Sequence, residues 1–305
     1  MQVEHNIELK NIEDEINLKE LFHVLIRGKW IIVSVTGFMS IIGVIYSLQL
    51  PNIYESRALL VSVDSSSSIS GTLKNYSGLA GLAGISLPSS SPDSNSAKAI
   101  KTMSSLSFFE NNLMPQIFLP DLMAVDSWDE KTNIITYDEG NYNKNSNSWI
   151  ILPSAQESFS VFKGHLTIIE DKQDGFITLT IKHQSPLIAK QWVELIINEV
   201  NTFYKQKDKS QSEKSVNYLN NQIAMTTLSE VKQVFAELLQ QETQKLTLVE
   251  ANEFYVFDYI DPPAVMEKKS EPSRAILCIL SALLGGMLSI VLVLIKHYTS
   301  RKKAS

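Results

Sequence analysis

The chain has 305 residues, of which 44% are hydrophobic and 20% are charged, and its formal net charge is −6. The acidic balance argues against general nucleic-acid binding, which requires basic clusters. The single cysteine, Cys278, excludes an internal disulfide and a zinc site built from cysteines. Two uncharged segments, 30–50 and 275–295, argue against a soluble cytosolic enzyme, because each is long enough as a helix to cross a bilayer.

Flanking charges give these two predicted spans an orientation. Arg27 and Lys29 precede the first span, and Lys296 and the 301–303 run follow the second. The positive-inside rule therefore places both termini in the cytoplasm. The sequence predicts five regions: a cytoplasmic segment 1–29, a transmembrane helix 30–50, a periplasmic domain 51–274, a transmembrane helix 275–295 and a cytoplasmic tail 296–305.

Each span has an alternative interpretation. The first could be a cleaved signal peptide, although its apolar run exceeds the roughly 7–15 residues that are usual there. The second could be the buried core helix of a soluble protein.

Small residues recur one helical turn apart in both spans, which lets helix backbones approach closely in lipid. The alternative is that glycine and serine are simply tolerated in spans. The candidates for helix packing in the second span are Ser281, Gly285 and Ser289 on one face, and Ala282 and Gly286 on the next. In the first span, Thr36 precedes Ser40 and Gly43 precedes Ser47 by the same step.

The first half of the outer domain begins with a predicted strand over 52–63, whose period of two places Tyr54, Ala58 and Leu60 on one side. A serine-rich stretch follows over 64–96. Its apolar part, Ser77 to Leu87, is expected either to pack on a neighbour or to form a flexible loop. Residues 97–114 predict a helix, and 120–150 predict an irregular surface.

The second half begins with a predicted hairpin, His165 to Glu170 and Phe176 to Ile181, with Asp174-Gly175 at the turn. Ser185-Pro186 then caps a predicted long helix over 186–250. Its apolar stripe is interrupted near Thr226 and Thr227, which fits either a helix that returns to the base or one rod in a ring of rods. Residues 254–260 predict a closing strand.

These elements predict an α+β fold. It has a membrane-proximal mixed sheet and a long extended helix, and two transmembrane helices flank it.

Catalytic motifs are missing from the sequence. It contains no phosphate-binding loop, H-E-x-x-H, C-x-x-C or G-x-S-x-G pattern. His165 and His183 flank the hairpin and are expected to be solvated rather than a metal pair. Glu170, Asp171 and Asp174 are interpreted as an acidic turn rather than paired catalytic carboxylates. We therefore predict no catalytic, cofactor-binding or metal-binding residues and no cofactor.

The order of these features resembles the bacterial polysaccharide co-polymerases, the Wzz-type chain length determinants, over almost the whole chain. A proline that is usual in the family is replaced by Met266. The residues that carry the resemblance are Glu15 to Leu18, Arg27 to Trp30, Pro51, Tyr54, Ser77 to Leu87, Tyr255 to Pro263, Glu271 to Arg274, and Gly285-Gly286.

The resemblance implies a non-enzymatic protein of the Gram-negative inner membrane that forms ring-like homo-oligomers. Such proteins set the modal length of a lipid-linked polysaccharide, such as lipopolysaccharide O antigen, that a separate polymerase makes. The implied partners are this polymerase, the lipid-linked polysaccharide, membrane lipid and other copies of the chain. The small residues of the second span become candidates for polymerase contact. Membrane-proximal structural candidates are Pro51, Tyr54, Pro262, Pro263 and Pro272.

Two other functional classes stay open. A membrane adaptor for a separate tyrosine kinase or exporter would dock through residues 1–29. A sensory ectodomain or hydrolase would bind a ligand, or turn over a substrate, with residues 51–274. Larger relatives carry a cytoplasmic kinase domain, which we do not expect here because the sequence ends shortly after the second span.

Overall fold

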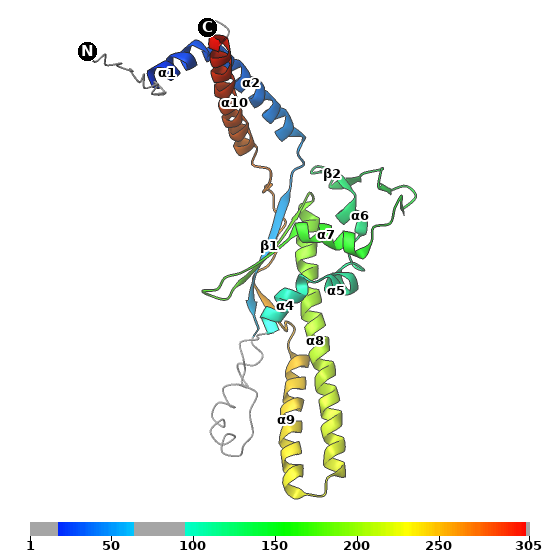
Figure 1. The fold of residues 1–305 in the computed structure, drawn as a ribbon. Helices are drawn as coiled ribbons and strands as arrows, with labels where there is room; N and C mark the ends of the chain where they lie inside the picture. Colours follow the sequence, from blue (N-terminus) through cyan, green and yellow to red (C-terminus); the bar gives the residue numbers. More distant parts are fainter. Residues whose placement is uncertain (1–17, 64–94, 303–305) are drawn as a thin grey trace, which may run out of the picture. The chain divides into compact units, whose positions relative to one another are not determined.

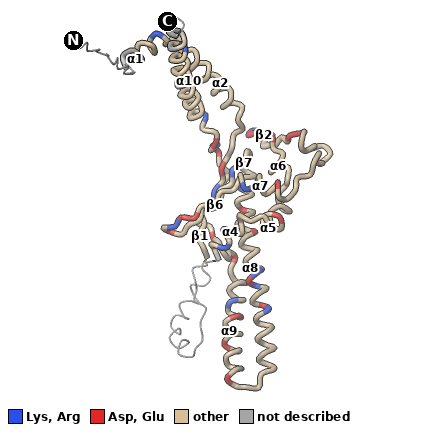
Figure 2. Tube along the Cα trace, viewed as in Figure 1, with Lys and Arg blue, Asp and Glu red and all other residues tan. Residues whose placement is uncertain are grey.

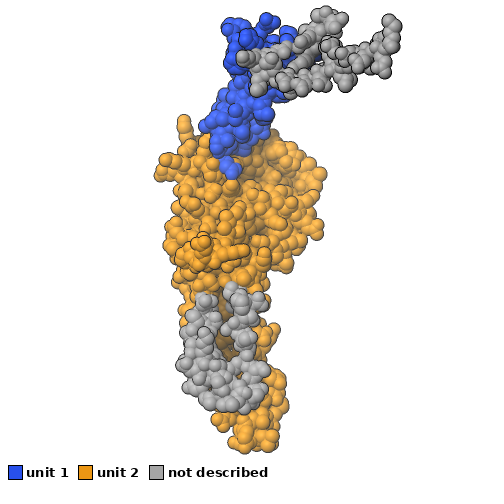
Figure 3. Space-filling view, turned by 60° about the vertical axis from the view of Figure 1, so that its left-hand side comes forward, with its two compact units in different colours: residues 1–51, 271–305 blue, residues 52–270 orange. Residues whose placement is uncertain are grey.

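The computed structural model describes residues 18–63 and 95–302 (Figure 1). The chain divides into two compact units, residues 1–51 with 271–305, and residues 52–270 (Figure 3). The apolar segment Ser77 to Leu87 lies outside the described residues. We describe each unit in turn.

The first unit consists of α1 (Leu18–Arg27), α2 (Lys29–Gln49) and α10 (Arg274–Lys302). Two stretches, Lys29–Gln49 and Arg274–His297, are long and apolar enough to cross a membrane. Large apolar side chains such as Phe38, Leu283 and Leu284 are each about 60% exposed, which suits a lipid-facing surface. The two apolar stretches start and end within two residues of the predicted spans.

The second unit is built on an antiparallel sheet in which the strands follow the order β6-β7-β1-β8. Its strands are β1 (Tyr54–Ser62), β6 (Leu166–Glu170), β7 (Ile177–His183) and β8 (Phe257–Asp261). Alternate β1 residues, Tyr54, Ser56, Ala58 and Leu60, are buried, as the period-two pattern predicted.

The α+β class is confirmed, but the prediction of a mixed sheet is wrong. Each pair in the sheet, β1 with β7, β1 with β8 and β6 with β7, is antiparallel. The reason is topological. β1 leads away from the start of the unit and β8 leads back to its end, so these neighbours run in opposite directions.

The long helix α8 (Pro186–Met225) covers the sheet with its first half. Buried residues such as Ala189, Val193, Ile196 and Val200 recur at three- and four-residue steps and form the core with the strands. The hydroxyl of Ser185 accepts a hydrogen bond from the amide of Ile188, which confirms the predicted cap.

The second half of α8 pairs with α9 (Ser229–Ala251) in a helical hairpin (Figure 1). The helix therefore breaks at 226–228 and returns, which is the first of the two predicted alternatives. Lys205 Nζ donates to the carbonyl of Asn252 over 2.7 Å, and the Tyr255 hydroxyl donates to Asp208 over 2.6 Å. These hydrogen bonds join α8 to the residues that follow α9, at the base of the hairpin.

Two predictions about the smaller elements differ from the structure. The predicted helix 97–114 is interrupted at Ser104 and Ser105, because the Ser105 hydroxyl caps a new turn at Phe108. The pieces are α4 (Asn95–Met103), α5 (Leu106–Phe108) and the π-helical η1 (Phe109–Leu113). The region predicted to be irregular contains α6 (Leu119–Met123), β2 (Val125–Asp129), β3 (Ile134–Tyr137), β4 (Tyr142–Asn143) and β5 (Ser148–Trp149).

A helix not predicted from the sequence, α7 (Ala155–His165), precedes β6. Ser154 and Glu157 form a reciprocal capping box at its start. Phe162 of α7 is fully buried and lies 4.9 Å from the ring of Phe109, measured between centroids. This contact joins α7 to the core.

Candidate functional site

The two candidate spans pack against each other through small residues. A methyl group on Gly285 of α10 would lie 2.7 Å from Cβ of Met39 and 3.2 Å from Cα of Thr36, both on α2. Any side chain on Gly43 would overlap Ser281. Glycine at these two positions therefore permits the close approach of the helix backbones.

The same contacts show that the two helices are antiparallel. At the other end of the pair, Gly28 at the start of α2 faces Val293 near the end of α10, and a methyl group on Gly28 would lie 2.5 Å from a γ-carbon of this valine. The basic residues Lys29 and Lys296 consequently lie at the same end of the pair.

The five predicted packing residues separate into two groups. Ser281 and Gly285 contact α2, and Gly285 and Ser289 are buried. Ala282 is half-buried, and a methyl group on Gly286 would lie 3.9 Å from the hydroxyl oxygen of Thr36 on α2, an ordinary van der Waals contact. Two adjacent glycines therefore have different environments.

The hydroxyls of Ser281 and Ser289 are satisfied within their own helix, whereas that of Thr36 on α2, beside Gly285, is buried without a hydrogen-bond partner. Ser281 donates to the carbonyl of Cys278 over 2.9 Å, and Ser289 donates to that of Gly286 over 2.6 Å. These serines act as small residues and need no polar partner on α2.

The predicted membrane-proximal residues fall in both units. In the second unit, Tyr54 is buried, and its ring lies edge-on to Trp128 at 5.2 Å between centroids. Pro262 and Pro263 follow the last residue of β8, and Pro263 is buried. Pro51 and Pro272 belong to the first unit, where Pro51 is exposed and Pro272 half-buried.

Hydrogen bonds join the two ends of the second unit next to Tyr54. Ser270 donates from its amide to the carbonyl of Ile53 over 2.9 Å, and Lys269 donates to the side chain of Asn52 over 3.0 Å. The unit therefore begins and ends at one place.

The two histidines of the hairpin lie close together, with ring centroids 5.9 Å apart. The prediction that both are solvated is wrong for His183, which is 2% exposed and packs against Trp192. The amide of Ser185 donates to its Nδ1 over 2.9 Å, so Nε2 carries the proton and donates to the carbonyl of Asp121 over 2.8 Å. Both ring nitrogens of His183 are thus engaged by the backbone, which leaves no lone pair for a metal.

Acid is expected to destabilise the second unit through His183. The pKa of His183 is lowered to about 4, chiefly because the ring is buried; the Asp121 carbonyl partly offsets this by raising the pKa, and the nearby His165 adds to the lowering. Between about pH 6.5 and 4 the unfolded chain binds a proton that the folded chain does not. The stabilisation from neutral His183 is therefore complete above about pH 6.5, and about 3 kcal/mol is lost as the pH falls to 4.

Thermal unfolding of the full chain in detergent, followed as a function of pH, measures this effect. The variant His183→Gln keeps a donor and an acceptor without titrating, so its unfolding temperature should fall less steeply with acid. His23→Gln, at an exposed histidine, is the control and should keep the wild-type slope. Equal slopes for the wild type and His183→Gln would contradict the assignment.

Asn201 of α8 is a residue that sequence reasoning missed. Its Oδ1 accepts from the amides of Val256 and Phe257 over 2.8 and 2.9 Å, and its Nδ2 donates to the carbonyl of Phe257 over 2.9 Å. The side chain is buried and fixes the start of β8 against the helix. The available signal was a polar residue inside the apolar face of a long helix.

A comparison with known families finds a match for the first third of the sequence. Residues 14–112 match the family model described as Wzz, chain length determinant protein. This region is therefore similar to the Wzz chain length determinants. The matched residues include α1, α2 and β1, so they cover the first candidate span and the strand that follows it.

Two solved structures of the same kind resemble the chain. A full-length bacterial polysaccharide co-polymerase is 14% identical with a TM-score of 0.40, and the match covers 94% of this chain and 99% of that chain. A fragment of WzzB, a polysaccharide co-polymerase from Salmonella Typhimurium, is 12% identical with a TM-score of 0.30, covering 72% and 100% respectively. No curated protein matches the sequence significantly.

Proposed function

We propose that this Wzz-family protein regulates the modal chain length of a lipid-linked surface polysaccharide, with lipopolysaccharide O antigen as the first candidate. The observation that carries the proposal is the match of residues 14–112 to the chain length determinant model. The polysaccharide is made by a separate polymerase, and the protein acts as a non-catalytic oligomeric scaffold.

The membrane arrangement in this proposal follows from the antiparallel helix pair. Arg27 and Lys29 at the start of α2 and Lys296 at the end of α10 lie at one end of the pair. The positive-inside rule assigns this end to the cytoplasm. Residues 52–270 are then periplasmic, where they reach the growing polymer.

The scaffold role is supported by the surface of the α8–α9 hairpin. Val234 and Leu238, one turn apart on α9, are 47% and 42% exposed, and Met225 and Leu228 at the tip are exposed as well. An apolar row on the exposed side of a helix favours packing against another helix. In the proposal, this row contacts a second copy of the chain within a ring-like homo-oligomer.

Deletion of the gene is expected to change the lipopolysaccharide ladder on a gel. The modal band should collapse to a broad, random distribution, because polymerisation continues without a length regulator. Reintroduction of the gene on a plasmid should restore the modal band, and an empty plasmid is the control.

An unchanged ladder would contradict control of O antigen. The same strains would then be compared for capsule and for other lipid-linked polymers. Loss of export or of tyrosine phosphorylation, with normal lengths for each polymer, would favour the adaptor function.

A further inference from the structure

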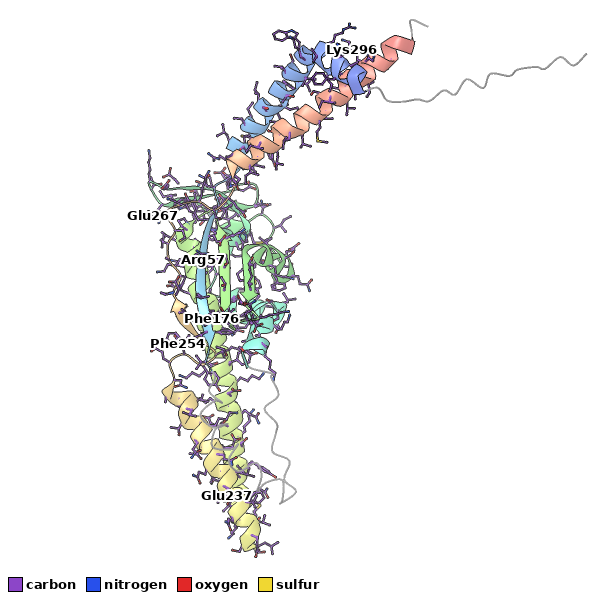
Figure 4. The ribbon with its side chains drawn as sticks, turned by 90° about the vertical axis from the view of Figure 1, so that its left-hand side faces the viewer. Arg57, Phe176, Glu237, Phe254, Glu267 and Lys296 are labelled. Atoms are coloured by element: carbon purple, nitrogen blue, oxygen red, sulfur yellow. The ribbon has the colours of Figure 1, made fainter. Side chains whose placement is uncertain are left out.

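A cavity of about 480 Å³ lies at the end of the first unit where α1, the start of α2 and the end of α10 meet. Four of its lining residues are basic or titratable: His23 and Arg27 from α1, and Lys296 and His297 from α10. Figure 4 shows Lys296 where α10 passes the blue helices α1 and α2, and Figure 2 shows lysine and arginine at this end of the unit. No carboxylate is among the described residues that line the cavity.

The rest of the lining is apolar. Val24, Ile31 and Val293 contribute one side chain from each of the three helices. The cavity therefore has a cationic part and a hydrocarbon part. Free phosphate would use only the cationic part, whereas a molecule with a phosphate and an acyl chain would use both.

The ends of the two uncharged runs indicate how deep this cavity would lie in a bilayer. The uncharged run of α2 begins at Trp30, two residues after the cavity residue Gly28, and the uncharged run of α10 ends at Ile295, directly before Lys296. Trp30 is 74% exposed, as expected for a residue of an interfacial aromatic belt. The cavity thus lies at the level of the lipid headgroups.

We propose that this cavity binds the phosphate of an anionic phospholipid. Arg27 and Lys296 pair with the phosphate oxygens, and the first methylene groups of an acyl chain lie on Val24, Ile31 and Val293. Basic cavities between membrane helices on the cytoplasmic side suit such headgroups, because the inner leaflet is anionic and an arginine binds phosphate through two donors. Bound lipid would hold α1 against the two spans.

The test is native mass spectrometry of the full chain in detergent, titrated with phosphatidylglycerol or with phosphatidylcholine. The wild type is expected to retain phosphatidylglycerol several-fold better than phosphatidylcholine. Arg27→Gln and Lys296→Gln should each lower phosphatidylglycerol affinity by roughly fivefold, and Lys296→Arg should restore it. Lys29→Gln removes the same charge at the same end but from outside the cavity lining, so it should have little effect.

Three outcomes would overturn the proposal. If Lys29→Gln and Lys296→Gln lowered phosphatidylglycerol affinity equally, the lipid would be attracted by the general positive charge of this end and not by a specific site. Equal retention of the two lipids would show that the phosphate charge is not recognised. Displacement of the lipid by glycerol phosphate, which has no acyl chains, would identify a site for soluble phosphate esters. Helix content by circular dichroism verifies that each variant is folded, and the test is independent of any effect on polysaccharide length.

Discussion

Replacement of Gly285 by leucine is expected to separate α10 from α2, whereas the same change at Gly286 should leave the pair in place. The added Cβ at 285 would lie 3.2 Å from a backbone carbon of Thr36, which cannot rotate away. At 286 the nearest such contact is 3.9 Å, and the leucine can point outward. Overpacking of this kind costs roughly 1–3 kcal/mol.

Disulfide formation between two new cysteines can report the separation. Gly28→Cys and Val293→Cys, in a Cys278→Ser background, place two thiols in contact at the far end of the pair. Adding Gly285→Leu should slow their oxidation by roughly tenfold, because 1.4 kcal/mol corresponds to a factor of ten. Adding Gly286→Leu is the matched control and should leave the rate near that of the parent.

The same two leucine variants test whether the helix pair matters for length control. Under the proposed function, Gly285→Leu should shift the modal band of the polysaccharide while the protein still inserts into the membrane. A shift with Gly286→Leu alone would instead assign the function to an outward face that contacts another protein. An unchanged ladder with both variants would show that the packing of these helices has no part in length control.

Replacement of Asn201 by alanine is expected to destabilise the second unit by about 3–6 kcal/mol. It leaves two amides and one carbonyl of Val256 and Phe257 buried without partners, and each such group costs about 1–3 kcal/mol. For a unit of this size, the unfolding temperature should fall by roughly 10 °C.

Thermal unfolding of the full chain, followed by tryptophan fluorescence, measures this loss because Trp192 is buried in the affected core. Asn220→Ala, at an exposed position of the same helix, is the control and should change the unfolding temperature little. Equal unfolding temperatures for both variants would show that the Asn201 contacts contribute no net stability.

The sequence was sufficient for the elements whose hydrophobic pattern is strong. Both long apolar helices, β1, the β6–β7 hairpin, the cap of α8 and β8 were predicted close to their observed positions, because periodicity and turn chemistry are local signals. The strand pattern did not specify the direction of its neighbours, so the sheet was wrongly predicted as mixed.

The rotation of a helix was harder to predict than its existence. On α9, Val234 and Leu238 are exposed, whereas Phe235 and Leu239 are half-buried, and the spacing of apolar residues alone does not show which row faces α8. Likewise, the sequence does not show which of Gly285 and Gly286 packs closely against α2, and only the structure distinguishes them. Asn201 and His183 also escaped prediction because their partners are backbone groups from distant segments.

The hydrogen bond from Ser270 to Ile53 has a consequence for evolution and engineering. Residues 52–270 form an insertion between two halves of a helical hairpin, and the junctions lie side by side. A domain whose ends meet can be exchanged or circularly permuted with short linkers. Proteins built on this plan can therefore diversify by replacing the inserted residues, while the pair of long apolar helices is kept unchanged.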